Sequence, residues 1–133
     1  MWKRTRVVFG LILLFSPVLL AMQAQEFQKG SYVAHPPNNP SATFELYFGE
    51  DGKVTVKMNG NVMVEGKYVI KENRLEVLDQ AGPMACTTGQ TGSYTWKLDG
   101  KRLTLKAADD KCEGRVAALG NNEWLRGGLP VAL

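Results

Sequence analysis

The residues whose types suit chemistry gather in one short stretch, Asp109 to Arg115 (DDKCEGR). Asp109, Asp110 and Glu113 supply carboxylate oxygens, the ligands that hard cations such as Ca²⁺ bind. Their spacing matches no calcium loop, which would follow a D-x-D-x-D-G pattern with a distant glutamate. We therefore expect a solvated turn here, with one carboxylate paired to Arg115 and no metal site.

Histidine and cysteine are scarce. His35 is the only histidine, and Cys86 and Cys112 are the only cysteines. Because we expect the cysteines to pair with each other, no zinc or copper site can be built from His and Cys ligands. A Ser-His-Asp or Cys-His arrangement is implausible for the same reason. Two carboxylates alone can support glycosidase chemistry. However, we expect every Asp and Glu of the expected strands to lie on the solvent-facing side of the sheet or to end a turn. We expect neither catalysis nor a cofactor.

The first 24 residues have the order of a secretory signal peptide. A basic segment (residues 2–6) precedes an uncharged apolar run (residues 7–21), and small side chains lead to a polar stretch after Ala24. The run is short for a membrane-spanning helix, which needs about 20 apolar residues. No cysteine follows residues 20–21 to accept a lipid. We expect cleavage after Ala24, a secreted or periplasmic protein, and no stable membrane anchor after cleavage.

Loss of this segment leaves a neutral domain. The chain has 16 Lys and Arg against 13 Asp and Glu, and the excess of three lies within the first six residues. Charges of both signs are interspersed along residues 25–133. A neutral domain gives no argument for nucleic acid or an anionic membrane as partner. Its length suits one domain with a single core, with the core at 28–120 and an apolar C-terminal tail at 121–133.

Apolar and polar side chains alternate along most of this domain. Phe44, Leu46 and Phe48 fall on one face, and the residues between them fall on the other. No segment sustains the spacing of three and four that a helix needs. The pattern predicts an all-β, antiparallel up-and-down meander with one apolar and one wet face. The expected strands, about eight in number, are 30–35, 42–48, 53–58, 62–70, 74–79, 91–98, 102–107 and 113–119.

A meander also predicts which loops lie together, because successive connections alternate between its two ends. Loops at 36–41, 59–61, 80–90 and 108–112 then share one end, and tight turns at 49–52, 71–73 and 99–100 share the other. The cysteines fall in the loops 80–90 and 108–112. Neighbouring loops can bring two Cα atoms within the roughly 4.4–6.8 Å that a disulfide needs. We therefore predict a bond between Cys86 and Cys112.

Several motifs distinguish this chain from a generic meander: Gly30, Tyr32, Asp110, Cys112 and Arg115, with G-x-Y-x-W at Gly92 to Trp96. In these the chain resembles the calycin superfamily, and in style the small secreted lipocalin-like proteins of bacteria. The resemblance implies a closed barrel in which an aromatic residue of the first strand packs beneath a basic residue of the last. Here Tyr32 stands in place of the usual tryptophan and Arg115 supplies the base, and no C-terminal helix is evident after the last expected strand.

A second, partial resemblance is to META-type bacterial domains. Gly66-x-Tyr68, Leu75 and the segment Gly82 to Cys86 carry it. The Gly-Cys-Asn segment usual in those domains is missing, so the lipocalin-like interpretation is preferred.

Arg115 has a structural and a functional interpretation. As the closing residue that the resemblance implies, it would stack on Tyr32 or Trp124, a cation–π contact of about 0.5–2 kcal/mol. Facing inward instead, its guanidinium would bind the carboxylate of a ligand through two parallel hydrogen bonds. The structural interpretation is the preferred one.

Two functions remain open for the bulky apolar face. In the first, the barrel binds a small apolar or amphipathic molecule at its long-loop end, contacted by Phe44, Tyr68, Trp96 and Arg115. In the alternative, side chains fill the interior, as they do in many eight-stranded barrels. The protein is then an interaction module or inhibitor in the cell envelope, which contacts a protein partner through an apolar patch around 36–37 and 83–84.

Overall fold

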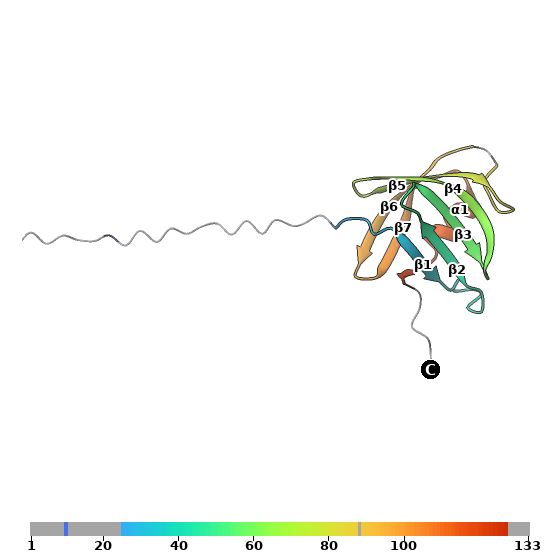
Figure 1. Cartoon of the computed structure of the whole chain (residues 1–133), viewed down its shortest axis with the longest axis horizontal. Helices are drawn as coiled ribbons and strands as arrows, with labels where there is room; N and C mark the ends of the chain where they lie inside the picture. The colour runs from blue at the N-terminus through green and yellow to red at the C-terminus, as the bar shows by residue number, and fades with distance from the viewer. Residues whose placement is uncertain (1–9, 11–24, 88, 128–133) are drawn as a thin grey trace, which may run out of the picture.

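The computed structural model describes Gly10, residues 25–87 and residues 89–127. The predicted signal peptide, apart from Gly10, and the end of the tail at 128–133 lie outside the described residues. The described residues form a closed barrel with one helix (Figure 1). Its elements are β1 (Gly30–Ala34), β2 (Phe44–Phe48), β3 (Lys53–Met58), β4 (Asn61–Lys71), β5 (Arg74–Ala81), β6 (Gly92–Asp99), β7 (Arg102–Asp109), α1 (Glu113–Gly120) and β8 (Trp124–Arg126).

The strands follow one another around the barrel in sequence order. Every neighbouring pair is antiparallel, and β8 pairs with β1 to close the sheet. The predicted all-β, up-and-down fold with eight strands is therefore confirmed. Alternation along each strand turns every second side chain inward, and these side chains form a single core. Its largest fully buried members are Trp124, Tyr32, Tyr94, Phe48, Leu46, Leu75, Leu103 and Leu105.

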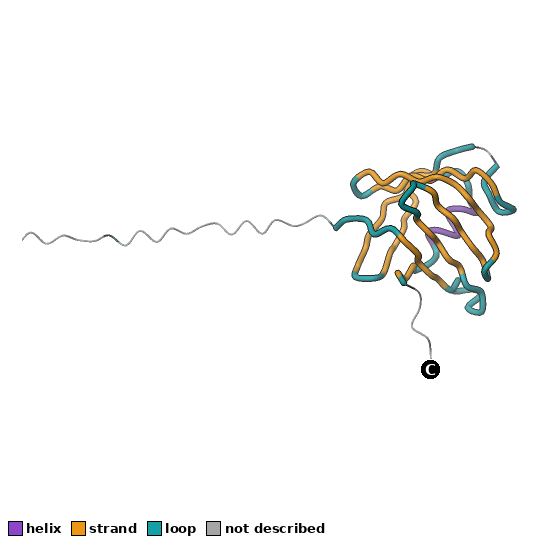
Figure 2. The backbone as a smooth tube through the Cα atoms, viewed as in Figure 1, coloured by secondary structure: helices purple, strands orange, loops and turns teal. Residues whose placement is uncertain are grey.

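The two ends of the barrel differ, as the meander predicts. Short turns join β2 to β3, β4 to β5 and β6 to β7 at one end, which we call the tight-turn end. The other, the long-loop end, carries the connections 35–43, 82–91 and 110–123, with α1 inside the last of them (Figure 2). At the tight-turn end, Phe27 precedes β1 and packs against Phe48 and Trp96, with ring centroids 4.9 and 5.3 Å away.

Three Gly-x-Tyr motifs share one arrangement. Tyr32, Tyr68 and Tyr94 are all buried inside the barrel, and each hydroxyl donates a hydrogen bond. The acceptors are backbone carbonyls for Tyr32 and Tyr68 and the Asp110 carboxylate for Tyr94. The strand register also shifts beside the glycine of the second motif and beside the tyrosine of the third. Each motif therefore places a large ring in the core where its polar tip has a partner.

The prediction of a strand at 113–119 is wrong, because these residues form the helix α1. Its two buried side chains, Arg115 and Leu119, are four residues apart, which is the spacing of one helix face. The eighth strand is β8, which lies in the predicted C-terminal tail and whose Trp124 is buried in the core. Three residues are enough to pair with β1 on one side and β7 on the other.

The basic residue opposite Tyr32 is consequently Arg126, not Arg115. The Arg126 guanidinium is exposed at the tight-turn end and donates hydrogen bonds to the Gln28 side chain (3.2 Å) and the Lys29 carbonyl (3.3 Å). It ties the segment before β1 to the last strand. The prediction that Arg115 is the closing base of the last strand is therefore wrong, because Arg115 lies on α1.

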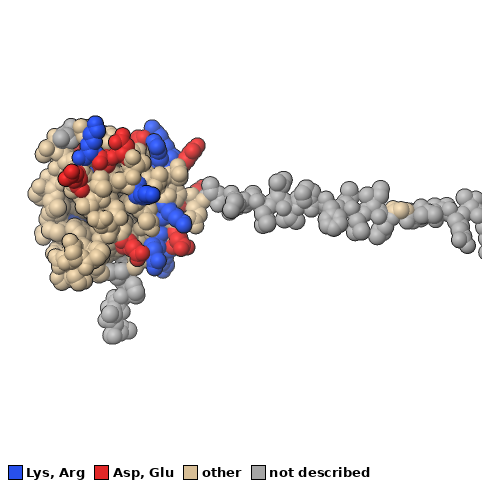
Figure 3. Space-filling model, turned by 180° about the vertical axis from the view of Figure 1, so that it is seen from behind, with Lys and Arg blue, Asp and Glu red and all other residues tan. Residues whose placement is uncertain are grey.

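Charged side chains of both signs lie among one another on the outer surface (Figure 3). The ion pairs found there join exposed groups, such as Lys29 with Glu50 at 3.6 Å and Arg102 with Glu123 at 3.8 Å. Exposed pairs of this kind contribute about 0–1 kcal/mol each. Within the described residues, no helix combines the length and the apolar character needed to cross a bilayer.

Candidate functional site

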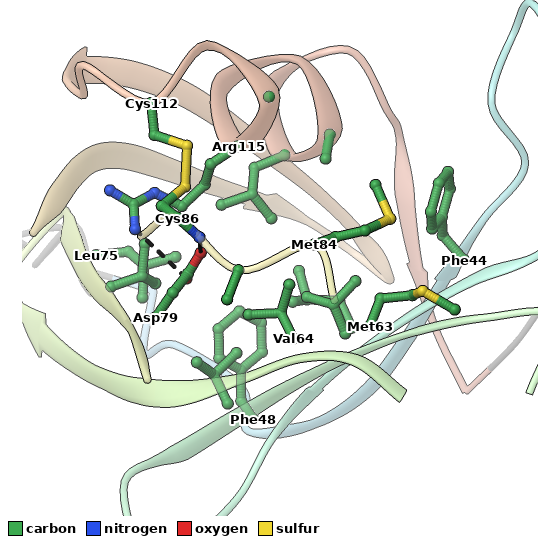
Figure 4. A pocket seen from close by; sticks show the side chains of 18 residues that line it. Phe44, Phe48, Met63, Val64, Leu75, Asp79, Met84, Cys86, Cys112 and Arg115 are labelled. Carbon is green, nitrogen blue, oxygen red and sulfur yellow. Dashed lines mark hydrogen bonds and ion pairs between the residues drawn. A yellow bond between two sulfur atoms is a disulfide. The ribbon is translucent and has the colours of Figure 1, made fainter. Parts of the chain in front are cut away.

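A cavity of about 130 Å³ lies in the barrel, between the core and α1. Strands β2 to β5, the start of the loop after β5, and one face of α1 form its wall. The lining is almost entirely apolar (Figure 4). Its apolar side chains are Phe44, Leu46, Phe48, Val54, Val56, Met63, Val64, Leu75, Val77, Met84, Ala85, Ala118 and Leu119.

Two periodicities bring these side chains to one place. Every second residue of β2 and β5 points into the barrel, which turns Phe44 on β2 and Asp79 on β5 toward the same space. On α1 the residues three and four positions apart share a face, so Arg115, Ala118 and Leu119 all line the cavity. The helix thus covers the barrel at its long-loop end.

Asp79 and Arg115 are the charged residues of the cavity lining in the described part of the chain. Their side chains are 6% and 5% exposed, and Arg115 Nη1 lies 3.4 Å from Asp79 Oδ1. Figure 4 shows both on one side of the cavity, with Phe44, Met63 and Met84 on the other. The cavity is therefore apolar along most of its wall and charged at one end.

Asp110 holds the Arg115 guanidinium from outside the cavity lining. Arg115 Nε donates to Asp110 Oδ2 at 2.6 Å, and Nη2 donates to Oδ1 at 2.8 Å and to the Gln90 carbonyl at 2.9 Å. The Tyr94 hydroxyl donates to the same carboxylate, whose side chain is fully buried. A bidentate pair of this kind fixes the orientation of the guanidinium. The predicted pairing of Arg115 with an acidic neighbour is confirmed, but the expectation of a solvated turn is wrong for Asp110, whose side chain is fully buried.

Gly92 allows this pair to pack against β6. A Cβ built on Gly92 would lie 2.3 Å from Asp110 Oδ2 and 2.8 Å from Arg115 Nη2. Both distances are far below van der Waals contact, so any side chain here would push the pair away from the strand. The glycine of the third Gly-x-Tyr motif therefore makes room for the ion pair, while Tyr94, two residues later, donates to it.

The pKa shifts of Asp110 and Arg115 keep both side chains ionised. Burial raises the pKa of Asp110, but hydrogen bonds from Arg115, Tyr94 and the Cys112 amide outweigh it, so the pKa lies below its usual range. Burial lowers the pKa of Arg115, and its pairing with Asp110 and Asp79 more than reverses that effect. Burial, followed by the hydrogen bond to Asp110, raises the pKa of Tyr94 well above its usual value. Tyr94 therefore remains a neutral donor to a charged pair.

Cys86 and Cys112 lie at disulfide distance, with Cα atoms 6.3 Å apart, as the loop assignment predicts. They join the loop after β5 to the start of α1, and both line the cavity. The Cys86 amide donates to Asp79 Oδ2 at 2.8 Å, and the Cys112 amide donates to Asp110 Oδ1 at 3.0 Å. Cys86 and Cys112 thus join two parts of the cavity wall. Their backbone amides also donate hydrogen bonds to the two carboxylates that flank Arg115.

The four residues predicted to contact a ligand fall into two groups. Phe44 and Arg115 line the cavity. Tyr68 and Trp96 lie at the tight-turn end instead, where they pack around Phe27. There the Tyr68 hydroxyl donates to the Gly49 carbonyl (2.6 Å), and Trp96 Nε1 donates to the Glu72 carbonyl (2.9 Å). Both aromatic side chains help to close that end.

The prediction that Arg115 stacks on Tyr32 or Trp124 is wrong, because Arg115 and Trp124 each have other partners. Arg115 contacts carboxylates, and Trp124 Nε1 donates to the Leu119 carbonyl at 3.1 Å. The physical reason is the helix α1, which turns Arg115 toward the end of β5 rather than toward β1.

Asp79 is the site residue that the sequence reasoning missed. The expectation that every acidic residue of a strand faces water or ends a turn is wrong for this position, because its side chain is buried in the cavity wall. The signal was present in the alternation. Leu75 and Val77 face inward, and Asp79 continues the same series of every second residue. A carboxylate at an inward position predicts a buried partner, and Arg115 provides one.

The fold and the site together define a closed, eight-stranded antiparallel β-barrel with a small internal cavity beneath a helix. Comparison with known proteins adds no relative: no protein-family model, no curated protein and no solved structure matches the chain. A function for this chain therefore rests on the geometry of its own site.

Proposed function

We propose that the protein is an exported, lipocalin-like binding protein that holds a small apolar or amphipathic molecule and performs no catalysis. The observation that carries the proposal is the apolar cavity of about 130 Å³ with one charged end. Natural cores are packed with few voids larger than a water molecule. An apolar cavity of this size leaves packing contacts unmade, and an apolar ligand would make them.

The volume limits the ligand to a small molecule. An apolar cavity of about 150 Å³ binds benzene, whereas pockets for drug-sized ligands measure about 300–1,000 Å³. A single ring or a short alkyl chain fits 130 Å³, and a long-chain lipid exceeds it. Burial would contribute about 25 cal/mol for each Å² of apolar surface removed from water.

The cysteine pair supports the export part of the proposal. Disulfides form and persist in oxidising compartments such as the periplasm and the exterior, and Cys86 and Cys112 lie at bonding distance. The predicted signal peptide at 1–24 would deliver the chain there. Cleavage after Ala24 would leave a chain that begins just before Phe27, the residue that packs into the tight-turn end.

Toluene is a suitable first probe because it is apolar and close to the cavity in size. We expect toluene to raise the thermal midpoint of the protein and to release or absorb heat in titration calorimetry. Substitution of Ala118, which lines the cavity on α1, by leucine should abolish both effects by filling the space. Ala117→Leu is the matched control, because Ala117 is exposed on the same helix. No toluene effect in the unmodified protein, or an equal effect in Ala118→Leu, would contradict the proposal.

An interaction module in the cell envelope is the second candidate. Exposed Met84 and Val62, 55% and 41% accessible near the long-loop end, are the observations in its favour. This candidate requires a filled interior, however, and the cavity argues against that. Pro36, one of the residues expected in its apolar patch, is buried. The toluene experiment separates the two candidates, because a filled barrel would take up no probe.

A further inference from the structure

The Asp79 carboxylate is buried in the cavity wall with most of its hydrogen-bonding capacity unused. Its side chain is 6% exposed. One oxygen accepts the Cys86 amide at 2.8 Å, and the other has only the long contact to Arg115 Nη1 at 3.4 Å. An ionised carboxylate can accept about four hydrogen bonds, and a buried charge is costly unless it is paired and hydrogen-bonded. Asp79 therefore presents an acceptor to whatever occupies the cavity.

Arg115 does not neutralise Asp79 fully, because Asp110 already pairs with it. Asp110 accepts hydrogen bonds from Arg115 Nε at 2.6 Å and from Nη2 at 2.8 Å. Asp110 itself does not line the cavity. The buried group thus holds two carboxylates against one guanidinium, a formal charge of −1. Arg115 is the only cation within 4.0 Å of either carboxylate among the described residues. The unmatched negative charge faces the cavity at Asp79.

We propose that the ligand is a small apolar molecule whose polar group is a protonated amine, bound by the Asp79 carboxylate. This inference rests on the proposed binding function and specifies its ligand class. The ammonium donates to Asp79 Oδ1 at the charged end of the cavity. The apolar body extends toward Phe44, Met63 and Met84, which lie on the opposite side (Figure 4). A carboxylate ligand could accept a hydrogen bond from Arg115 Nη1, which is buried without a hydrogen-bond partner, but it would add a third carboxylate to a group that already holds two against one guanidinium.

A series of probes of nearly equal shape tests the charge preference: toluene, benzyl alcohol, benzylamine and benzoate. Their affinities are compared by titration calorimetry and thermal shift with the purified, oxidised protein at pH 7. Hydrogen bonds to charged groups contribute about 1.5–3 kcal/mol, which corresponds to roughly a tenfold to hundredfold change in Kd. We expect benzylamine to bind about tenfold to a hundredfold more tightly than toluene, and benzoate to bind more weakly than toluene.

Asp79→Asn removes the charge but keeps the shape and an acceptor for the Cys86 amide. We expect benzylamine to lose its advantage over toluene in this variant, and cooperative urea unfolding shows that the variant folds. Glu76→Gln is the matched control, because Glu76 lies on the same strand and pairs with Lys71 on the outer surface at 3.6 Å. That variant should keep the full preference for benzylamine.

The outcomes separate this inference from the function on which it rests. Toluene binding with no gain for benzylamine, tighter binding of benzoate, or an unchanged preference in Asp79→Asn would overturn the inference alone. Failure of all four probes to bind would overturn the proposed function and the inference together.

Discussion

Replacement of Arg115 by methionine is the perturbation for which the structure gives the clearest magnitude. Methionine keeps the apolar stem of the side chain and removes the guanidinium. Arg115 donates two hydrogen bonds to Asp110 and one to the Gln90 carbonyl, and its side chain is 5% exposed. Its loss leaves the Asp110 and Asp79 carboxylates buried without a cation. Breaking a buried pair by removing one partner costs about 3–5 kcal/mol.

This loss is a large part of the total stability, because the free energy of unfolding of a typical native protein is about 5–15 kcal/mol. Urea unfolding of the oxidised protein at pH 7, followed by tryptophan fluorescence, measures the change. Arg102→Met is the control, since Arg102 is 54% exposed and its contact with Glu123 is 3.8 Å long. We expect this control to cost less than about 1 kcal/mol.

A double variant tests whether the cost arises from uncompensated charge. Adding Asp110→Asn to Arg115→Met removes one of the two unpaired carboxylates, so we expect the double variant to be more stable than Arg115→Met. Residues in one ion-pair network show such non-additive effects. If Arg115→Met costs no more than Arg102→Met, or if the two substitutions add, the account of a charged group stabilised by pairing is refuted.

The remaining predictions concern the cysteines and acid. In protein recovered from the exported fraction, with Gln25 as its first residue, we expect Cys86 and Cys112 to be unreactive toward thiol reagents until a reductant is added; reduction should then lower the unfolding free energy by about 3 kcal/mol. Two free thiols in that fraction would count against the bond, and absence of the protein from that fraction would count against export. Because the pKa of Asp110 lies below its usual value in the folded state, its contribution to stability is complete above about pH 4 and is lost as the pH falls further. The slope of unfolding free energy against pH below 4 should therefore be smaller in Asp110→Asn, and an unchanged slope would argue against this assignment.

The strands were predictable because their signal is local. Alternation of apolar and polar residues fixes which side chains face inward, and turns between the runs fix the direction of each strand. Since a meander alternates its connections, the common location of Cys86 and Cys112 followed from the strand count alone. The helix α1 was missed because eight residues give only two turns of pattern. Arg115 and Leu119 carry its spacing, but an arginine does not count toward a pattern of apolar residues.

The site was harder to predict because it depends on contacts between distant segments. Asp79, Gln90, Asp110 and Arg115 come from a strand, a loop, a connection and a helix. The sequence predicted the pairing of Arg115 with an acidic neighbour, and the inward position of Asp79 was visible in the alternation. The division of the aromatic residues between the two ends was not visible, because Phe27 lies before the first strand and outside any alternating run. Its packing against Phe48 and Trp96 assigns those rings to closure of the tight-turn end.

The cavity follows from side-chain size rather than from topology. An eight-stranded barrel is just wide enough for its own side chains to fill it, and at the tight-turn end the rings of Phe27, Tyr68 and Trp96 pack together. Several positions of the cavity wall carry smaller residues, among them Val56 on β3 and Ala118 on α1. The same backbone with larger residues there would enclose no space. One added leucine side chain at position 118 should therefore be enough to convert a binding barrel into a filled one, whereas binding that survives this change would place the ligand elsewhere.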